Sequence, residues 1–239
     1  MSYRRWKSFV VAIRDIEHPP GVLLSKAARI AQRFGGRLEL LHVIALPYVL
    51  PGDTAGREFS KDAEIARQLT KLERMAKRLR KIGIDVKCSV VWDYPAADAI
   101  VRHVLNTRPD VVLAESHHHS KLSRWFVTHT DWELIRSCPC PLWLIKTSRL
   151  MDDLRVLAAV DPLHAHSKPA ALDEEILRAA QSVAAESGRV GVAHIYAVPI
   201  TMVAGGLGEP IWVAAPASEM RQVRQQVTRA VDALAERYA

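Results

Sequence analysis

Short apolar runs alternate with longer amphipathic stretches from residue 9 to residue 145 of the chain. The runs are almost continuously apolar, a pattern typical of strands that are buried on both faces of a parallel sheet. Five such strands alternating with four helices predict an α/β fold built on a doubly wound, open parallel sheet. The expected strands are Phe9–Ile13, Leu38–Ile44, Val86–Val91, Val111–Ala114 and Leu142–Ile145, and the expected helices cover residues 23–34, 61–81, 95–105 and those from Asp131 onward.

The pattern starts again after a polar segment that ends at residue 153. Val156–Pro162 repeats the first strand, and Ser187–Pro199 parallels Gly35–Pro47 so closely that His194 matches His42. Self-similarity of this kind predicts two copies of one domain in tandem, at residues 1–148 and 149–239. We expect both histidines to be core residues bonded to neighbouring backbone, because each lies in a separate copy and they cannot form a catalytic pair.

The second copy is expected to be incomplete. Its second strand is followed by a glycine-containing loop, Ile200–Ala217, and by an amphipathic helix, Met220–Tyr238, with no counterpart of the last three strands of the first copy. Two strands and two helices bury little apolar surface on their own. We therefore expect self-association as a homodimer, either through the apolar edge strand Leu142–Ile145 or by docking of the second copy on the first.

The run from residue 130 to residue 146 carries a family resemblance. Its ending, CPCPLWLIK at 138–146, resembles the final turn and fifth strand of the universal stress protein superfamily. The sequence TDW at 130–132 resembles the tandem, UspE-type branch of that superfamily. The resemblance implies a Rossmann-like sheet of the adenine nucleotide alpha hydrolase type, with strand order 3-2-1-4-5, in a cytoplasmic protein of the stress response.

The resemblance also implies where a nucleotide would bind. Nucleotide-binding members of the superfamily carry the signature Gly-x-x-Gly, nine residues, then Gly-Ser or Gly-Thr, whose backbone amides hold the phosphates. Counting back from residues 140 and 141 places these positions at Glu115, His118, Thr128 and His129, and none of the three glycines is present. Glu115 would put a carboxylate where the phosphate sits, and the other side chains would add bulk. The sequence therefore predicts a degenerate nucleotide site.

One alternative stays open, in which ATP or another anion still binds. Thr130 and Glu133 have the spacing of a capping box at the start of a helix. The N-terminus of such a helix offers free amides to an anion even without glycines. The cofactor prediction is thus none, with ATP as the alternative.

The same superfamily ends its first strand in an aspartate. Arg14 stands at that position here, and the second copy keeps the aspartate as Asp161, without a phosphate-binding loop opposite it. In the implied strand order Arg14 and Glu115 end neighbouring strands and face one crevice, where open α/β sheets bind ligands. We predict an ion pair between Arg14 and Glu115, or a variant of it that uses Asp15.

Composition narrows the classes of function. A net charge of +7 suggests a nucleic-acid partner, but no basic–aromatic RNA-binding signature is present and many of the basic residues lie on the helix over 61–81. We therefore expect no nucleic-acid binding. No apolar run approaches the 18 or so residues of a membrane span, and three cysteines form no disulfide framework, so a cytoplasmic protein without a membrane partner is expected.

Other candidate chemistry is weaker. His117, His118 and His119 could bind a transition metal, but consecutive histidines on a loop point in different directions, and we predict no metal site. Cys138 and Cys140 flank a proline, which we expect to hold the two thiols poorly for a disulfide. No set of nucleophile, base and orienting residue is visible, so no enzyme activity is predicted.

The sequence thus favours a cytoplasmic stress-response regulator or interaction module with a degenerate nucleotide site. The alternative is a universal stress protein that binds ATP or another small ligand.

Overall fold

The computed structural model describes residues 6–46, 60–116, 130–146, 154–163, 169, 171–184, 188–197, 200–204 and 210–238. The chain divides into two compact units, residues 5–150 and residues 151–239.

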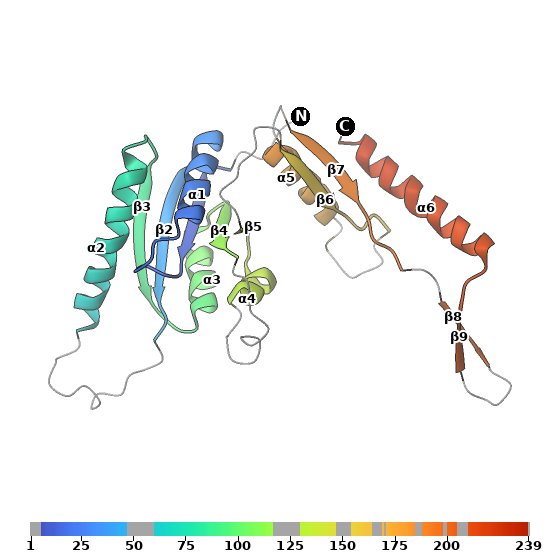
Figure 1. The fold of residues 1–239 in the computed structure, drawn as a ribbon, viewed down its shortest axis with the longest axis horizontal. Coiled ribbons are helices and arrows are strands. Elements are labelled where there is room, and N and C mark those ends of the chain that lie inside the picture. Colours follow the sequence, from blue (N-terminus) through green and yellow to red (C-terminus); the bar gives the residue numbers. More distant parts are fainter. Residues whose placement is uncertain are drawn as a thin grey trace. The chain divides into compact units, whose positions relative to one another are not determined.

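The first unit is built on a five-stranded parallel sheet (Figure 1). The strand order is β3-β2-β1-β4-β5, which confirms the predicted order and fold class. Residues of β1 and β4 such as Val11, Val111 and Leu113 are fully buried, as expected for central strands covered on both faces. The strands are β1 (Ser8–Ile13), β2 (Arg37–Ile44), β3 (Val86–Trp92), β4 (Val111–Glu115) and β5 (Leu142–Ile145).

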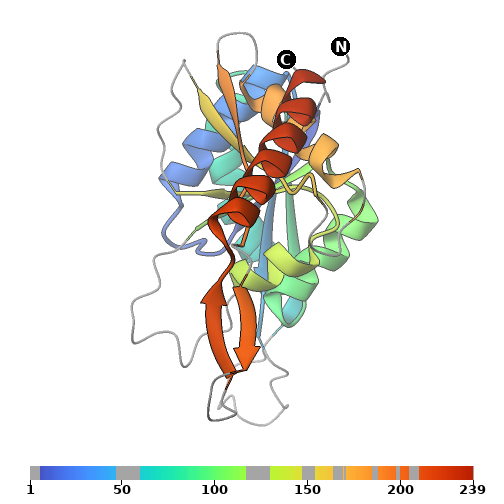
Figure 2. The same ribbon diagram turned by 90° about the vertical axis from the view of Figure 1, so that its right-hand side faces the viewer.

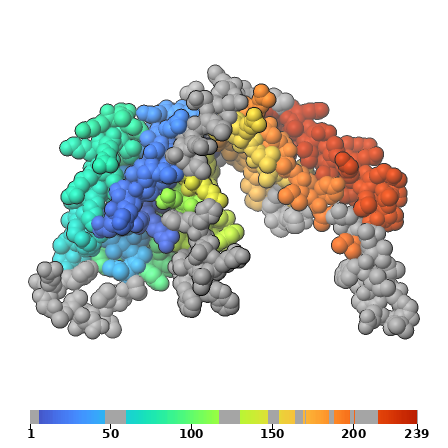
Figure 3. Space-filling view, viewed as in Figure 1, coloured from blue at the N-terminus to red at the C-terminus, as the bar shows by residue number. Residues whose placement is uncertain are grey.

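Helices cover both faces of this sheet. The apolar side chains of α3 and α4 pack in one cluster with Val10, Leu41 and Val112, which therefore face these two helices. Phe9 points the other way and contacts Phe34 of α1. α2 packs on β3, and its outer side forms a continuous part of the surface of the unit (Figure 3). The helices are α1 (Gly21–Phe34), α2 (Lys61–Arg80), α3 (Ala96–Thr107) and α4 (Thr130–Ser137).

The end of α1 and the start of α4 differ in how they are capped. α1 ends at Gly35, which adopts the left-handed conformation with φ 57° that glycine takes most readily. The Lys7 ammonium donates to the carbonyl oxygens of Phe34 and Gly35 at 2.7 and 3.2 Å, where a cation is favoured. α4 already includes Thr130, so this residue is not the N-cap that the capping-box spacing predicts.

An aromatic cluster ties the segment before β1 to α1 and to the edge strand β5. Trp6 is fully buried, and its ring centroid lies 5.5 Å from that of Phe34 and 5.3 Å from that of Trp143. The Phe34 and Trp143 rings are themselves 6.5 Å apart. Such tilted and edge-to-face pairs are favourable beyond the apolar area that they bury.

Asp110 holds the amino ends of the central strands together. Its Oδ2 accepts hydrogen bonds from the backbone N–H groups of Lys7 and Ser8 at 2.8 and 2.9 Å, and from the Ser8 hydroxyl at 2.8 Å. A carboxylate that accepts several N–H and O–H groups makes stronger bonds than a neutral acceptor would. This contact fixes the start of β1 against the start of β4.

In the second unit a parallel pair of strands packs against two helices. β6 (Arg155–Ala159) and β7 (Arg189–Ala193) pair in parallel, with α5 (Leu172–Ala184) between them in the chain. Ala158, Leu177 of α5 and Leu234 of α6 (Ala217–Glu236) belong to one buried cluster. On the opposite face of β6 the side chain of Leu157 is 70% exposed.

The expected loop at Ile200–Ala217 contains a β-hairpin instead. β8 (Ile200–Ala204) and β9 (Pro210–Ala214) pair antiparallel and lead into α6 (Figure 2). The sequence ITMVA and the sequence PIWVA are both rich in residues that favour strands, and a glycine-rich segment separates them. The prediction gave weight to the glycines and overlooked the strand propensity on either side.

The two histidines matched in the sequence make the same contact in their separate units. Nδ1 of His42 lies 2.8 Å from the carbonyl oxygen of Ile13, and Nδ1 of His194 lies 2.8 Å from that of Val160. Ile13 is the last residue of β1, and Val160 directly follows β6, so both carbonyl groups stand at the end of the neighbouring parallel strand. The expectation of core histidines bonded to backbone is confirmed for the first unit and for the second.

Gly36, directly before β2, gives a direct test of packing. A β-carbon here would lie 2.6 Å from Cε2 of Phe9 and 2.9 Å from the carbonyl oxygen of Lys7, whereas nothing lies within 4 Å of a β-carbon at Gly21. We expect Gly36→Ala to lower the free energy of unfolding by about 2 kcal/mol because the backbone must move. Gly21→Ala should be neutral or stabilising by up to about 1 kcal/mol. Equal urea midpoints for the two variants would contradict this packing.

Candidate functional site

A cavity of about 210 Å³ opens at the carboxyl ends of the strands of the first unit. Its walls come from the ends of β1, β2 and β4 and from the first turns of α1, α3 and α4. Most of the lining is apolar, and the four polar residues are Arg14, Glu115, Thr130 and Asp131. The apolar lining residues are Ala12, Ile13, Pro20, Leu23, Leu41, Val43, Ala45, Ala96, Ile100, Ala114 and Leu134.

The structure brings Arg14 and Glu115 to this cavity, as predicted. β1 and β4 are neighbours, and Ala12 pairs with Ala114, so the two charged residues follow at adjacent strand ends. The predicted ion pair between Arg14 and Glu115, however, is not present among the ion pairs of the described residues. The sequence located the residues correctly but not their interaction.

The variant with Asp15 is also wrong, because Asp15 is engaged locally. Its Oδ1 accepts hydrogen bonds from the N–H groups of Glu17 and His18, both at 2.9 Å, and its Oδ2 lies 3.0 Å from Nδ1 of His18. Aspartates favour such turns within their own loop. The bonds from His18 lower the pKa of the Asp15 carboxyl below its ordinary value.

α4 presents an acidic N-terminus to the cavity. Thr130 and Asp131 line it, and Asp131 and Glu133 both lie in the first turn of the helix. Buried Leu134 anchors the helix on the cluster below. The partial positive charge at a helix N-terminus stabilises carboxylates in the first turn. These carboxylates offset the positive potential that would otherwise attract an anion.

The other predicted site residues are not brought to the cavity by the described part of the structure. His118, Thr128 and His129, and the remaining histidines His117 and His119, lie outside the described residues. Asp161 is in the second unit, where its N–H donates to Oδ1 of Asp173 at 3.1 Å. No group of three or more metal-ligating side chains occurs among the residues that the structure describes.

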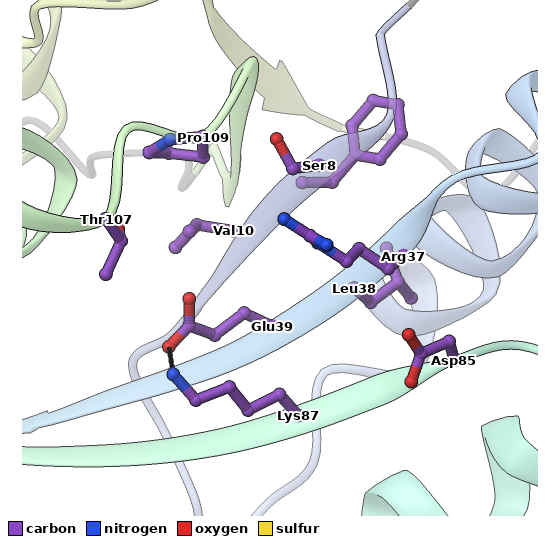
Figure 4. A pocket seen from close by; sticks show the side chains of 10 residues that line it. Ser8, Val10, Arg37, Leu38, Glu39, Asp85, Lys87, Thr107 and Pro109 are labelled. Atoms are coloured by element: carbon purple, nitrogen blue, oxygen red, sulfur yellow. Dashed lines mark ion pairs between the residues drawn. The ribbon is translucent and has the colours of Figure 1, made fainter.

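A larger hollow of about 380 Å³ lies at the amino ends of the strands and was not foreseen from the sequence (Figure 4). Its lining residues are Ser8, Phe9, Val10, Arg37, Leu38, Glu39, Asp85, Lys87, Thr107 and Pro109. The feature of the sequence that could have indicated this hollow is Glu39, a charged residue within an apolar run. Ligand sites of open α/β sheets lie at the opposite, carboxyl ends of the strands, so we do not assign ligand binding here.

Glu39 is the centre of a polar network in that hollow. Its Oε1 lies 2.5 Å from the Ser89 hydroxyl, 3.1 Å from Nε2 of His103 and 3.4 Å from Nζ of Lys87, the ion pair drawn in Figure 4. The hydrogen bond from His103, together with those from Ser89 and the charge of Lys87, lowers the pKa of Glu39 to about 2. The carboxylate is thus held ionised by its neighbours, which is a structural role.

None of the helices in the described part of the chain is both long and apolar enough to cross a membrane.

Comparisons with known proteins agree on one family. The model of the universal stress protein family matches residues 5–146. Universal stress protein E of Photorhabdus laumondii is 30% identical over 164 residues, which cover 67% of this chain and 52% of that protein. Universal stress protein E of Escherichia coli K12 is 27% identical over 183 residues, covering 74% and 57%. The chain therefore spans about half the length of the curated relatives that it matches.

Solved structures show the same fold. A crystal structure from Pseudomonas aeruginosa UCBPP-PA14, named as a universal stress protein, superimposes with a TM-score of 0.63 at 21% identity. The match covers 98% of this chain and 70% of that chain.

Proposed function

Because the chain belongs to the universal stress protein family and is a UspE-type member of it, we propose that it acts in the cytoplasm as a stress-response regulatory or interaction module. In this proposal the protein is not an enzyme, and its first unit has lost nucleotide binding. The observation that carries the proposal is the charge of the cavity at the strand ends.

Two carboxylates line that cavity where a phosphate would approach. Glu115 is the last residue of β4, and Asp131 lies in the first turn of α4. Each carboxylate repels an anion at contact distance by about 1 kcal/mol, even at the dielectric constant of water. The volume of about 210 Å³ is also below the range of about 300–1,000 Å³ that is usual for pockets of drug-sized ligands.

The lining favours one second candidate, a small ligand with a mostly apolar surface. Apolar side chains dominate the walls, and Arg14 is the cation among the described lining residues. A few polar groups in an apolar pocket are the usual arrangement for binding a small molecule. ATP, which is a polyanion, is a separate alternative that rests on membership of the family.

We further propose that residues 149–239 are a second, incomplete domain of the same family, after a first domain at 1–148. The strand–helix–strand arrangement of β6, α5 and β7 and the matching contacts of His42 and His194 support this assignment. β5 is an outer strand of its sheet, and an apolar outer strand favours pairing with another chain. We therefore propose homodimer formation through Leu142–Ile145.

Titration with Mg-ATP tests the proposed function. We expect no saturable heat with the full chain up to about 1 mM nucleotide, which corresponds to a binding free energy weaker than about 4 kcal/mol. The double variant Glu115→Gln, Asp131→Asn should bind at least about tenfold more tightly, because two repulsive charges are removed. Glu133→Gln is the matched control, since Glu133 lies in the same helical turn but does not line the cavity.

Two results would count against the proposal. Saturable binding of about one Mg-ATP per unmodified chain would show that the first unit has kept nucleotide binding. An equal gain in affinity for Mg-ATP in Glu133→Gln and in the double variant would show that the net charge of the protein, and not the charge of the cavity, controls binding.

A further inference from the structure

Cys138 and Cys140 lie in the short connection between α4 and β5, and their sulfur atoms are 3.9 Å apart. The connection is fixed at both ends. The N–H of Cys138 donates to the carbonyl oxygen of Leu134 at 2.9 Å, and the N–H of Val112 in β4 donates to that of Pro141 at 2.9 Å. The two sulfur atoms lie in contact while both cysteines are free, and the expectation that Pro139 holds them poorly for a disulfide stays a prediction.

Both thiols are partly buried, so they are shielded but reachable. They pack against the apolar cluster that includes Leu134, Val112 and Val104. A disulfide has an S–S length of about 2.05 Å. The sulfur atoms must therefore approach by roughly 2 Å, which rotation about the side-chain bonds can supply in large part.

The two thiols are not equivalent. The thiol and the backbone N–H of Cys140 both donate toward the Cys138 sulfur, and these bonds lower the pKa of Cys138 to about 6. The same hydrogen bond and burial raise the pKa of Cys140, and the negative charge of nearby Asp110 adds to that rise. The hydrogen bonds therefore favour the thiolate at Cys138 and the protonated thiol at Cys140.

Cys88 provides a contrast within the same chain. It lies in β3, and burial together with the carboxylate of Glu73 raises its pKa to about 12. A thiol in this state is a poor nucleophile.

We propose that Cys138 and Cys140 form a reversible dithiol–disulfide pair that reacts with small organic disulfides such as oxidised glutathione. The Cys138 thiolate attacks one sulfur of the small disulfide, forms a mixed disulfide and releases one small thiolate. Cys140 then attacks the Cys138 sulfur, releases the second small thiolate and gives up its proton to a departing thiolate. The protein loses two electrons and the one proton of Cys140, and the small disulfide is reduced to one thiol and one thiolate. This redox site is independent of what the cavity binds.

Equilibration with glutathione tests the pair. The full chain is held in buffers with an increasing share of oxidised glutathione, quenched with acid, alkylated and analysed by mass. We expect two of the three thiols to disappear in one step, and the fragment that carries residues 138–140 to become lighter by two hydrogen atoms. Cys88→Ser should behave like the unmodified chain, because Cys88 takes no part.

Single substitutions assign the two roles. Cys140→Ser should accumulate a glutathione adduct on Cys138, since the resolving thiol is gone. Cys138→Ser should react at least about tenfold more slowly at pH 7, because a thiol without a lowered pKa is mostly protonated. The rate in the unmodified chain should level off above about pH 6, the pKa of Cys138. Circular dichroism of each variant checks that it is folded.

The proposal is overturned if all three thiols remain free in fully oxidised buffer. It is equally overturned if the disulfide that forms contains Cys88 or joins two chains. A folded Cys138→Ser chain that reacts as fast as the unmodified chain would remove Cys138 from its assigned role.

Discussion

Replacement of Trp6 with alanine is expected to lower the free energy of unfolding of the first unit by about 3–5 kcal/mol. Trp6 is fully buried and contacts both Phe34 of α1 and Trp143 of β5. The substitution therefore leaves a cavity between a helix and the edge strand and removes two aromatic contacts. Urea denaturation followed by far-ultraviolet circular dichroism measures the loss.

Trp6→Phe is the matched control. The indole N–H of Trp6 is buried and has no hydrogen-bond partner among the described residues, so phenylalanine loses no polar contact. We expect Trp6→Phe to cost clearly less than Trp6→Ala, by about 1–2 kcal/mol or more, because it removes fewer buried atoms and keeps an aromatic ring in the cluster. If Trp6→Ala cost no more than Trp6→Phe, the aromatic cluster would not be a principal part of this core.

Replacement of Glu39 with glutamine is expected to make the first unit less stable at neutral pH by as much as about 3 kcal/mol. Its neighbours His103, Ser89 and Lys87 lower the pKa of Glu39 from the ordinary 4.5 to about 2. The ionised carboxylate thus contributes stability above about pH 4.5, and this contribution is lost as the pH falls toward about 2. Because the side chain is partly screened by water, the figure is an upper value.

The measurement compares urea denaturation of both chains from pH 7 to pH 2. The two curves of stability against pH should be farthest apart above pH 5 and should converge near pH 2. Lys87→Met is a control with a small expected effect, since the Lys87 side chain is 69% exposed. A constant difference between the unmodified chain and Glu39→Gln at all pH values would show that the charge of Glu39 is not what stabilises the unit.

The first unit could be predicted well because its strands are buried on both faces. Continuous apolar runs and regular helix signals gave its strands to within about one residue, as for β5, where the predicted and observed bounds of Leu142–Ile145 agree. The family resemblance supplied the strand order, which periodicity alone does not contain. Together these placed Arg14 and Glu115 at one cavity.

The side-chain interactions could not be predicted from the sequence, because they depend on the directions of the side chains and on competing local hydrogen bonds. Asp15 follows Arg14 at the end of β1 and could by position have formed an ion pair at the cavity. Its carboxylate instead accepts hydrogen bonds from the N–H groups of Glu17 and His18 in its own turn. The network around Glu39 joins β2, β3 and α3, so it involves residues up to 64 positions apart. The 3.9 Å between the sulfur atoms of Cys138 and Cys140 depends on their side-chain rotamers, in a connection that α4 and β4 fix at its two ends. The spacing of two residues in the sequence does not encode these rotamers.

The strand order has a consequence for how the first unit is made. β1 can pair with β2 as soon as both have left the ribosome, but its other edge waits for β4, and the bonds from Lys7 and Ser8 to Asp110 join residues 103 and 102 positions apart. At a synthesis rate of about 5–20 residues per second this delay lasts roughly 5–20 s. Completion of the sheet therefore depends on the arrival of β4 and β5, and the early β1–α1–β2 segment presents an unpaired apolar strand edge until then.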